Sequence, residues 1–274
     1  MSSIATMLYD VPSVLLFAVI CFVVIVLALI GVHIVKLTLP VELRLRDNLV
    51  IGYISANICV LFAVLTGFIL LYMLNSYGRA QEVVRIEINK ATAIHQNAAR
   101  LDKTITTQIQ KEIKTYLERV AFQEWPVMQR GGHIHSPLPL AQQKKYANLY
   151  GEAILIKIRK QLNSYQPKDY SKALAVAEIY KELAELYDAR DERLAFNEST
   201  LGTDIWLVLI ISALITIVVN FIYGVEHYPL YIALVPLTSI MIVSLLFIIF
   251  VMDQPFCGAY SIKSTEYQEV IVSI

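Results

Sequence analysis

Four long stretches of this chain contain no Asp, Glu, Lys or Arg, and they limit the possible folds more than any other feature. They cover residues 12–35, 49–78, 205–225 and 227–252. Each is at least as long as the roughly 20 apolar residues that an α-helix needs to cross about 30 Å of hydrocarbon. The whole chain is 57% hydrophobic and 17% charged, whereas about a quarter of a typical soluble domain is charged. We therefore predict a multi-pass membrane protein.

The stretches predict membrane-spanning helices at about 12–35, 49–74, 205–225 and 229–252. We expect two hairpins, because only short segments separate the first helix from the second and the third from the fourth. The expected divisions are a first hairpin at 1–78, a soluble domain at 79–203, a second hairpin at 204–252 and a C-terminal tail at 253–274. The first stretch is not expected to be a cleaved signal peptide, because residues 1–11 contain no Lys or Arg.

The polar region between the hairpins has the periodicity of α-helices. Apolar residues recur at spacings of three and four, which is typical of one helix face; they are Ile94, Ala98, Leu101, Ile105, Ile109, Ile113, Leu117 and Val120. This pattern predicts one helix of about 40 residues, from Arg79 to Phe122. Its apolar stripe either faces the core of its own domain or packs against neighbouring subunits, and the sequence leaves both alternatives open.

Proline and glycine residues break this helix within the segment EWPVMQRGGHIHSPLPL, residues 124–140. A second helix is expected at about 141–163, and a third from about Lys172, with Asp169 or Ser171 as its N-cap. No helix-stopping residue follows before Gly202, so the third helix is free to continue into the third membrane helix. The predicted fold class is an all-α membrane protein, with four transmembrane helices in two hairpins and a helical domain between the second and third.

Several functional classes are disfavoured by missing motifs. No run of five like charges occurs in the polar region, so no nucleic-acid partner is expected. No Gly-rich phosphate loop, serine elbow or HExxH motif occurs either, so we expect no enzyme and no cofactor. His133 and His135 form a His-x-His pair that is either a weak metal motif or part of a solvated loop, and the solvated loop is favoured. Cys21, Cys59 and Cys257 are too scattered for a disulfide framework or a zinc site.

The second apolar stretch carries more polar and aromatic residues than a lipid anchor needs. Val60, Val64 and Phe68 are four residues apart and form one row along the predicted helix. Polar side chains inside a membrane usually face protein or water, and glycine lets a second helix approach closely. Near the row, the polar residues are Asn57 and Thr66, the glycine is Gly67, and Leu61 is an apolar neighbour. Either hydrogen bonding between helices or a narrow apolar constriction lined by copies of one helix would explain this composition.

Two motifs resemble those of a known family. The segment AVLTGFILLYMLNSYGRAQE, residues 63–82, is similar to the second membrane helix of bestrophin anion channels, in which a glycine-phenylalanine pair is preceded by leucine. Here the pair is Gly67–Phe68, and Thr66 replaces the leucine. The chain most resembles the bacterial bestrophin-like family of unknown function. That resemblance rests also on an internal Gln123–Glu124–Trp125 motif and on the terminal MDQPFCGAY, whose motif residues are Asp253, Pro255, Phe256 and Gly258.

This resemblance implies a homo-oligomeric channel, a pentamer as in bestrophins, that passes small inorganic ions passively, with anions such as chloride preferred. The pore would be lined by the second membrane helix, with Val60, Val64 and Phe68 at its constriction. The resemblance also implies a bacterial inner membrane, with the helical domain in the cytoplasm. Calcium-activated bestrophins carry an acidic run after the terminal motif. Residues 259–268, AYSIKSTEYQ, contain a single acidic residue, so no calcium site is expected.

The charges that flank the membrane are divided between the two sides. The positive-inside rule gives most weight to short loops, and the short loop between the first two helices contains Lys36, Arg44 and Arg46. That count favours the short loop in the cytoplasm, against the orientation implied by the resemblance. On the domain side the flanking cations are Arg79, Arg85, Arg190 and Arg193.

A second functional class fits the same sequence. A membrane scaffold or sensor that conducts nothing, and whose helical domain recruits a partner, would also have this arrangement of helices. A transporter is less favoured, because broken helices at the membrane midplane are typical of transporters. Here only Pro236 interrupts a predicted span.

Overall fold

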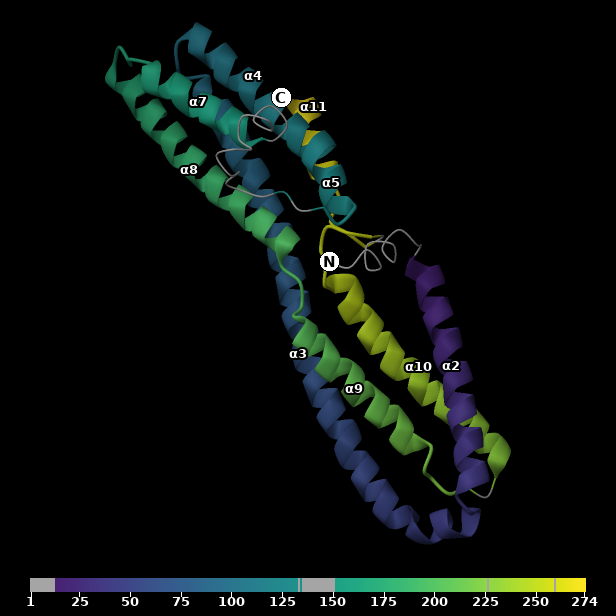
Figure 1. Ribbon diagram of the computed structural model, residues 1–274. Helices are drawn as coiled ribbons and strands as arrows, with labels where there is room; N and C mark the ends of the chain where they lie inside the picture. Colours follow the sequence, from purple (N-terminus) through teal and green to yellow (C-terminus); the bar gives the residue numbers. More distant parts are fainter. Residues whose placement is uncertain (1–12, 133, 135–150, 226, 259) are drawn as a thin grey trace. The chain divides into compact units, whose positions relative to one another are not determined.

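The computed structural model describes residues 13–132, 134, 151–225, 227–258 and 260–274, and within them the fold is all-α, as predicted (Figure 1). A π-helical turn, η1 (Val120–Glu124), links two of the α-helices. In chain order the α-helices are α2 (Ser13–Thr38), α3 (Val41–Ala98), α4 (Lys103–Arg119), α5 (Trp125–Gln129), α7 (Glu152–Ser164), α8 (Tyr170–Glu198), α9 (Thr203–Asn220), α10 (Tyr228–Met252) and α11 (Thr265–Ser273).

Among the described residues, four helices are long and apolar enough to cross a membrane: α2, α3, α9 and α10. The chain divides into two compact units. The first, here called the membrane unit, contains the described residues of 13–76 and 200–253. The second, here called the helical unit, contains the described residues of 77–199 and 254–274. The single helix α3, with 58 residues, contributes to both units.

In the membrane unit, α10 packs along α2 and also contacts α9. Hydrogen bonds hold the start of α3 to the segment between α9 and α10. The Asn48 side chain donates to the Gly224 carbonyl (2.6 Å) and accepts from the Gly224 amide (2.8 Å). Nη1 of Arg44 donates to the Tyr223 carbonyl at 3.0 Å. A Cβ atom at position 224 would lie 2.5 Å from the amide nitrogen of Leu45, so this close approach requires glycine.

The apolar stripe of the sequence forms the core of the helical unit. All eight of its members, Ile94, Ala98, Leu101, Ile105, Ile109, Ile113, Leu117 and Val120, are buried within one chain. The stripe therefore faces the core of its own domain. The prediction of one helix from 79 to 122 is wrong, because α3 ends at Ala98 and α4 begins at Lys103. The α4 helix runs back along α3: Gln110 Nε2 donates to the His95 carbonyl at 3.2 Å.

The predictions for the two later helices of the polar region have different outcomes. For the helix predicted at 141–163, the structure describes α7 from Glu152 onward, and residues 141–150 lie outside the described residues. His133 and His135 also lie outside the described residues. The predicted N-cap Asp169 is confirmed, since its carboxylate accepts from the Lys172 amide at 2.9 Å. Helix α8 stops at Glu198 and does not continue into α9. In the turn between them, Oδ1 of Asp253 accepts a hydrogen bond from the amide of Leu201 at 2.5 Å.

The C-terminal residues that were expected to form a tail are part of the helical unit. Their helix, α11, contacts α4 and η1. Tyr267 and Ile271 of α11 are buried in the same core as the stripe. The ring of Tyr267 lies 5.3 Å from that of Trp125, between centroids.

Candidate pore helix and buried charge cluster

One face of α3 is exposed in the membrane unit, and it carries the predicted constriction. The exposed fractions of Val60, Val64 and Phe68 are 60%, 51% and 71%. Asn57, Leu61 and Gly67 are exposed as well. Apart from the backbone of α3 around it, no described part of the chain lies within 4 Å of the place where a Cβ at Gly67 would stand. The exposed face is therefore free to contact lipid or another protein chain.

The opposite face of α3 packs into the membrane unit and includes one of the predicted site residues. Thr66 is 1% exposed, and its hydroxyl donates to the carbonyl of Phe62 at 2.5 Å. Phe62 and Met73 are buried on the same side. The structure therefore separates Thr66 from Val60, Val64 and Phe68, because residues two apart on a helix point in nearly opposite directions.

The terminal motif makes specific contacts in each unit. Just beyond α10, Oδ2 of Asp253 accepts from the Trp206 indole at 3.2 Å, in addition to the Leu201 contact of Oδ1. Burial raises the pKa of Asp253 above its ordinary value despite these two hydrogen bonds. In the helical unit, Phe256 is 1% exposed and meets Trp125 edge-on, with ring centroids 5.5 Å apart.

The rest of the motif shapes the chain that leads to α11. Gly258 has φ of 78°, in the left-handed region where glycine is favoured. Around it, the Pro255 carbonyl accepts from the Ile262 amide at 2.8 Å. The Ile262 carbonyl accepts from the Trp125 indole at 3.2 Å. The internal and terminal motifs of the sequence thus meet at Trp125.

Four charged side chains form a cluster in the core of the helical unit that the sequence did not reveal. Glu87, Glu124, Arg190 and Arg193 are all 0–1% exposed. Arg190 donates to both carboxylate oxygens of Glu124, at 2.7 and 2.8 Å. Arg193 bridges the two carboxylates, with its Nε 2.6 Å from Glu87 Oε2 and its Nη2 2.8 Å from Glu124 Oε2. The two positive and two negative charges balance.

Further polar groups complete the cluster. The Tyr116 hydroxyl donates to Oε1 of Glu87 at 2.6 Å, and the Gly151 amide donates to Oε1 of Glu124 at 2.8 Å. Each oxygen of Glu124 therefore accepts two hydrogen bonds. Burial by itself disfavours the charge of Glu124, but the guanidinium groups of Arg190 and Arg193 lower the pKa of this carboxyl to about 2. Burial also raises the pKa of Tyr116 well above its ordinary value, so at neutral pH the tyrosine is a neutral donor.

Comparison with known proteins gives the family of the chain. A family model described as a bestrophin-like domain matches residues 20–267. The chain belongs to the bestrophin-like family. No curated protein matches it.

The solved structures that are similar to this bestrophin-like chain share its fold at low sequence identity. A point mutant of a bacterial bestrophin homologue from Klebsiella pneumoniae has a TM-score of 0.68 and 9% identity, over 92% of this chain and 97% of the other. A structure of the Klebsiella homologue obtained by Zn-SAD phasing has a TM-score of 0.67 and 11% identity, over 91% and 95%. A crystal structure described as a membrane protein has a TM-score of 0.63 and 12% identity, over 92% and 95%. At these identities the likeness shows that the bestrophin-like chain shares their fold, and nothing beyond the fold.

The cluster also corrects the count of charges beside the membrane of this bestrophin-like protein. Arg190 and Arg193 were counted as flanking cations, but they are buried ion-pair partners. Only Arg79 and Arg85 of that group are exposed, and both contact carboxylates: Arg79 contacts Glu192 at 2.8 Å and Arg85 contacts Glu266 at 3.4 Å. A signal for this was present in the sequence, because both buried arginines continue the apolar face of α8 at helical spacing.

Within the described residues, no group of three or more His, Cys, Asp or Glu side chains is arranged to hold a metal ion. Apart from the buried Thr66, the predicted site residues lie in two places. The exposed face of α3 carries Val60, Val64 and Phe68, and the terminal motif holds together the ends of helices in each unit. Of these two, only the face of α3 is exposed.

Proposed function

We propose that this bestrophin-like protein is a homo-oligomeric channel that conducts small ions passively, with anions preferred, through a pore lined by α3. The observation that carries the proposal is the exposed row of Val60, Val64 and Phe68 on α3, whose opposite face is buried in the membrane unit. Membership of the bestrophin-like family supports it. No catalytic residue is part of the proposal.

A ring of identical subunits follows from the number of helices. Four helices in one chain do not enclose a pore, so symmetry has to supply the remaining walls. We propose a pentamer with α3 innermost, by analogy with bestrophins. Each copy would then add Val60, Val64 and Phe68 to a short apolar zone. Such a zone gates by dewetting, and the positive edges of phenylalanine rings suit anions.

We further propose that the protein lies in a bacterial inner membrane, with the helical unit in the cytoplasm. The charge count on the domain side does not decide this, because two of its four arginines are buried and the other two contact carboxylates. Two of the three short-loop cations also have contacts in the membrane unit, but neither partner is charged. Arg44 is 7% exposed and bonded to the Tyr223 carbonyl. The Lys36 ammonium lies 3.8 Å from the centre of the Tyr228 ring.

The first experiment measures assembly and conductance together. The protein is purified in mild detergent, its mass is measured by light scattering across concentrations, and it is then reconstituted into a planar bilayer. We expect an oligomer of defined mass and a current that rises with applied voltage. A monomer at every concentration would remove the basis for a pore.

The second experiment tests the constriction. Replacing Val60, Val64 and Phe68 together by alanine should widen the apolar zone, so the variant should pass more current and show less gating. The control is the triple alanine variant of Val19, Phe22 and Val26, which has the same composition and lies on the exposed side of α2. We expect the control to conduct like the wild type.

Both variants must first elute as the same oligomer as the wild type. If assembled wild type and assembled α3 variant carry no current for any ion, the channel proposal fails and a non-conducting scaffold takes its place. An equal increase in current for the α2 control would show that the row on α3 is not the constriction.

A further inference from the structure

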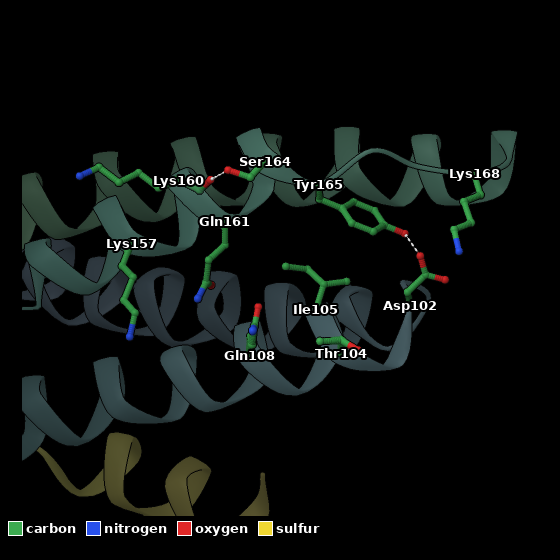
Figure 2. A pocket seen from close by; sticks show the side chains of 10 residues that line it. All are labelled: Asp102, Thr104, Ile105, Gln108, Lys157, Lys160, Gln161, Ser164, Tyr165 and Lys168. Atoms are coloured by element: carbon green, nitrogen blue, oxygen red, sulfur yellow. Dashed lines mark hydrogen bonds between the residues drawn. The ribbon is translucent and has the colours of Figure 1, made fainter.

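A groove of about 740 Å³ lies between α4 and α7 in the helical unit. Small-molecule sites have volumes of about 300–1,000 Å³. Lys157 lies at one end of the groove, and Tyr165 and Lys168, from the segment that joins α7 to α8, lie at the other (Figure 2). Between the ends, the apolar floor includes Ile105, which is 8% exposed. The groove thus has an apolar centre and polar ends.

The charge of the groove is positive. Three lysines line it, Lys157, Lys160 and Lys168, with a single carboxylate, that of Asp102. That carboxylate is already occupied, because it accepts from Lys172 Nζ at 2.7 Å and from the Tyr165 hydroxyl at 2.9 Å. Within the described residues, neither Lys160 nor Lys168 forms an ion pair. The third lysine, Lys157, pairs with Glu112. The groove therefore offers two ammonium groups that are not held in an ion pair.

A buried acceptor also faces this groove. Oε1 of Gln161 is shielded from solvent and accepts no hydrogen bond in the described part of the chain. Gln161 points toward Gln108, which lines the opposite wall from α4 (Figure 2). A buried carbonyl oxygen without a donor is uncommon, since most buried polar groups are paired. A ligand with a hydroxyl group would satisfy it.

We infer that the groove binds a small hydroxylated polycarboxylate. The separation of Lys160 from Lys168 along the groove favours several carboxylates on one carbon skeleton over a phosphate group, which concentrates its charge at one point. Carbon atoms of the ligand would rest on Ile105, and its hydroxyl would donate to Gln161. This site stands apart from the pore proposal, because all its residues belong to the helical unit and none is in the predicted constriction.

The test is isothermal titration calorimetry on the full chain in detergent. The probes are citrate, which has three carboxylates and one hydroxyl, tricarballylate, which has the carboxylates without the hydroxyl, and inorganic phosphate. We expect citrate to bind about tenfold more tightly than tricarballylate, the effect of one hydrogen bond to a buried acceptor. Inorganic phosphate should bind more weakly than either.

Single substitutions assign the binding to this groove. K160Q and K168Q should each weaken citrate binding about tenfold, since each removes a charge-assisted contact. Q161L should leave tricarballylate binding unchanged and abolish the advantage of citrate. K181Q is the control, because Lys181 is an exposed lysine of α8 outside the groove. Thermal unfolding of each variant checks that its fold is intact.

Three results would overturn the inference. Citrate that shows no binding at millimolar concentration excludes the ligand class. Citrate binding that K160Q and K168Q leave unchanged places the ligand elsewhere. Equal affinities for citrate and tricarballylate in the wild type refute the role of Gln161, and phosphate binding as tight as citrate refutes the argument from separated lysines.

Discussion

Glu124 occupies a site where every acceptor position is used. Its two oxygens each receive two hydrogen bonds, from Arg190, Arg193 and the Gly151 amide. Burial removes water from this carboxylate, so only these donors stabilise its charge. The residue is thus a structural ion-pair partner, and its contribution is best measured by stability.

The substitution Glu124→Gln should destabilise the protein strongly. The glutamine amide group would place two N–H donors against the arginine donors. It would leave Arg190 without a carboxylate partner and Arg193 with the carboxylate of Glu87 alone. Removing one partner of a buried ion pair costs about 3–5 kcal/mol. The matched control is Glu192→Gln, whose partner Arg79 is exposed, with an expected cost of about 1 kcal/mol or less. Denaturant unfolding in detergent measures both, and equal losses would contradict the structural role of the cluster.

Acid should unfold the helical unit through the same carboxyl. The folded-state pKa of Glu124 is about 2, below its ordinary value of 4.5. A lowered pKa stabilises the fold fully above about pH 4.5, and this stabilisation is lost as the pH falls toward 2. Fluorescence of Trp125, measured in a Trp206→Phe background against pH, should report cooperative unfolding in that window. An unfolding free energy that is constant from pH 5 to about pH 2 would refute this assignment.

At the scale of helices, the π-helical turn η1 determines where Glu124 and Trp125 point. A π-helical turn contains one residue more than an α-helical turn would need. Phe122 lies inside η1 and is 59% exposed, and Gln123 after it is exposed as well, so the core does not depend on the Phe122 side chain. On either side of it, Val120, Ala121 and Glu124 are buried.

Deleting Phe122 should therefore convert η1 to α-helix and keep Glu124 and Trp125 in the core. We expect a loss of about 1–3 kcal/mol. Deleting the exposed Lys111 in α4 is the control. It rotates the residues that follow by about 100° and moves Ile113 and Leu117 out of the core, so the variant should not fold. Circular dichroism and denaturant unfolding compare the two, and similar losses would show that η1 has no special tolerance.

Burial along the helices could be predicted from sequence better than helix ends. The eight stripe residues are all buried, because a spacing of three and four specifies a helix face. The break at 99–102 was missed because these residues include neither Gly nor Pro. It is stabilised by distant contacts, such as Asp102 with Lys172 and Tyr165. The charge cluster also depends on contacts between distant parts of the chain, because Glu87, Glu124 and Arg193 are far apart in sequence. It was therefore not predicted.

For the proposed pore helix, the spacing of residues could predict which of them share a row. It could not predict whether a row faces the interior of the membrane unit or its exposed surface. Val60, Val64 and Phe68 do lie on one exposed face of α3. Thr66 was placed beside them because it is polar, although its position in the helix turns it toward the interior of the membrane unit. A threonine hydroxyl can satisfy itself on the preceding turn of its own helix, as Thr66 does on the Phe62 carbonyl. Its polarity therefore gave no information about water.

At the scale of the whole molecule, orientation in the membrane is open to a direct measurement. Single cysteines are introduced at Thr38, which precedes α3, and at Lys181 of α8, both exposed positions. With a membrane-impermeant maleimide on intact cells, we expect position 38 to react and position 181 to react only after permeabilisation. Native Cys257 is buried, and the unmodified protein is the control for Cys21 and Cys59. The reverse pattern would show that the helical unit lies outside.

The helical unit is built from two separate segments of the chain, so a cell can complete its folding only after the second segment has been synthesised. Residues 77–199 leave the ribosome before α9 and α10, whereas residues 254–274 leave after them. During that interval the Trp125 ring lacks two of its packing partners, the rings of Phe256 and Tyr267. The helical unit of each newly made chain therefore stays incomplete until α9 and α10 have been synthesised. A ribosome that stalls in α10 would release a chain whose helical unit lacks Phe256 and Tyr267.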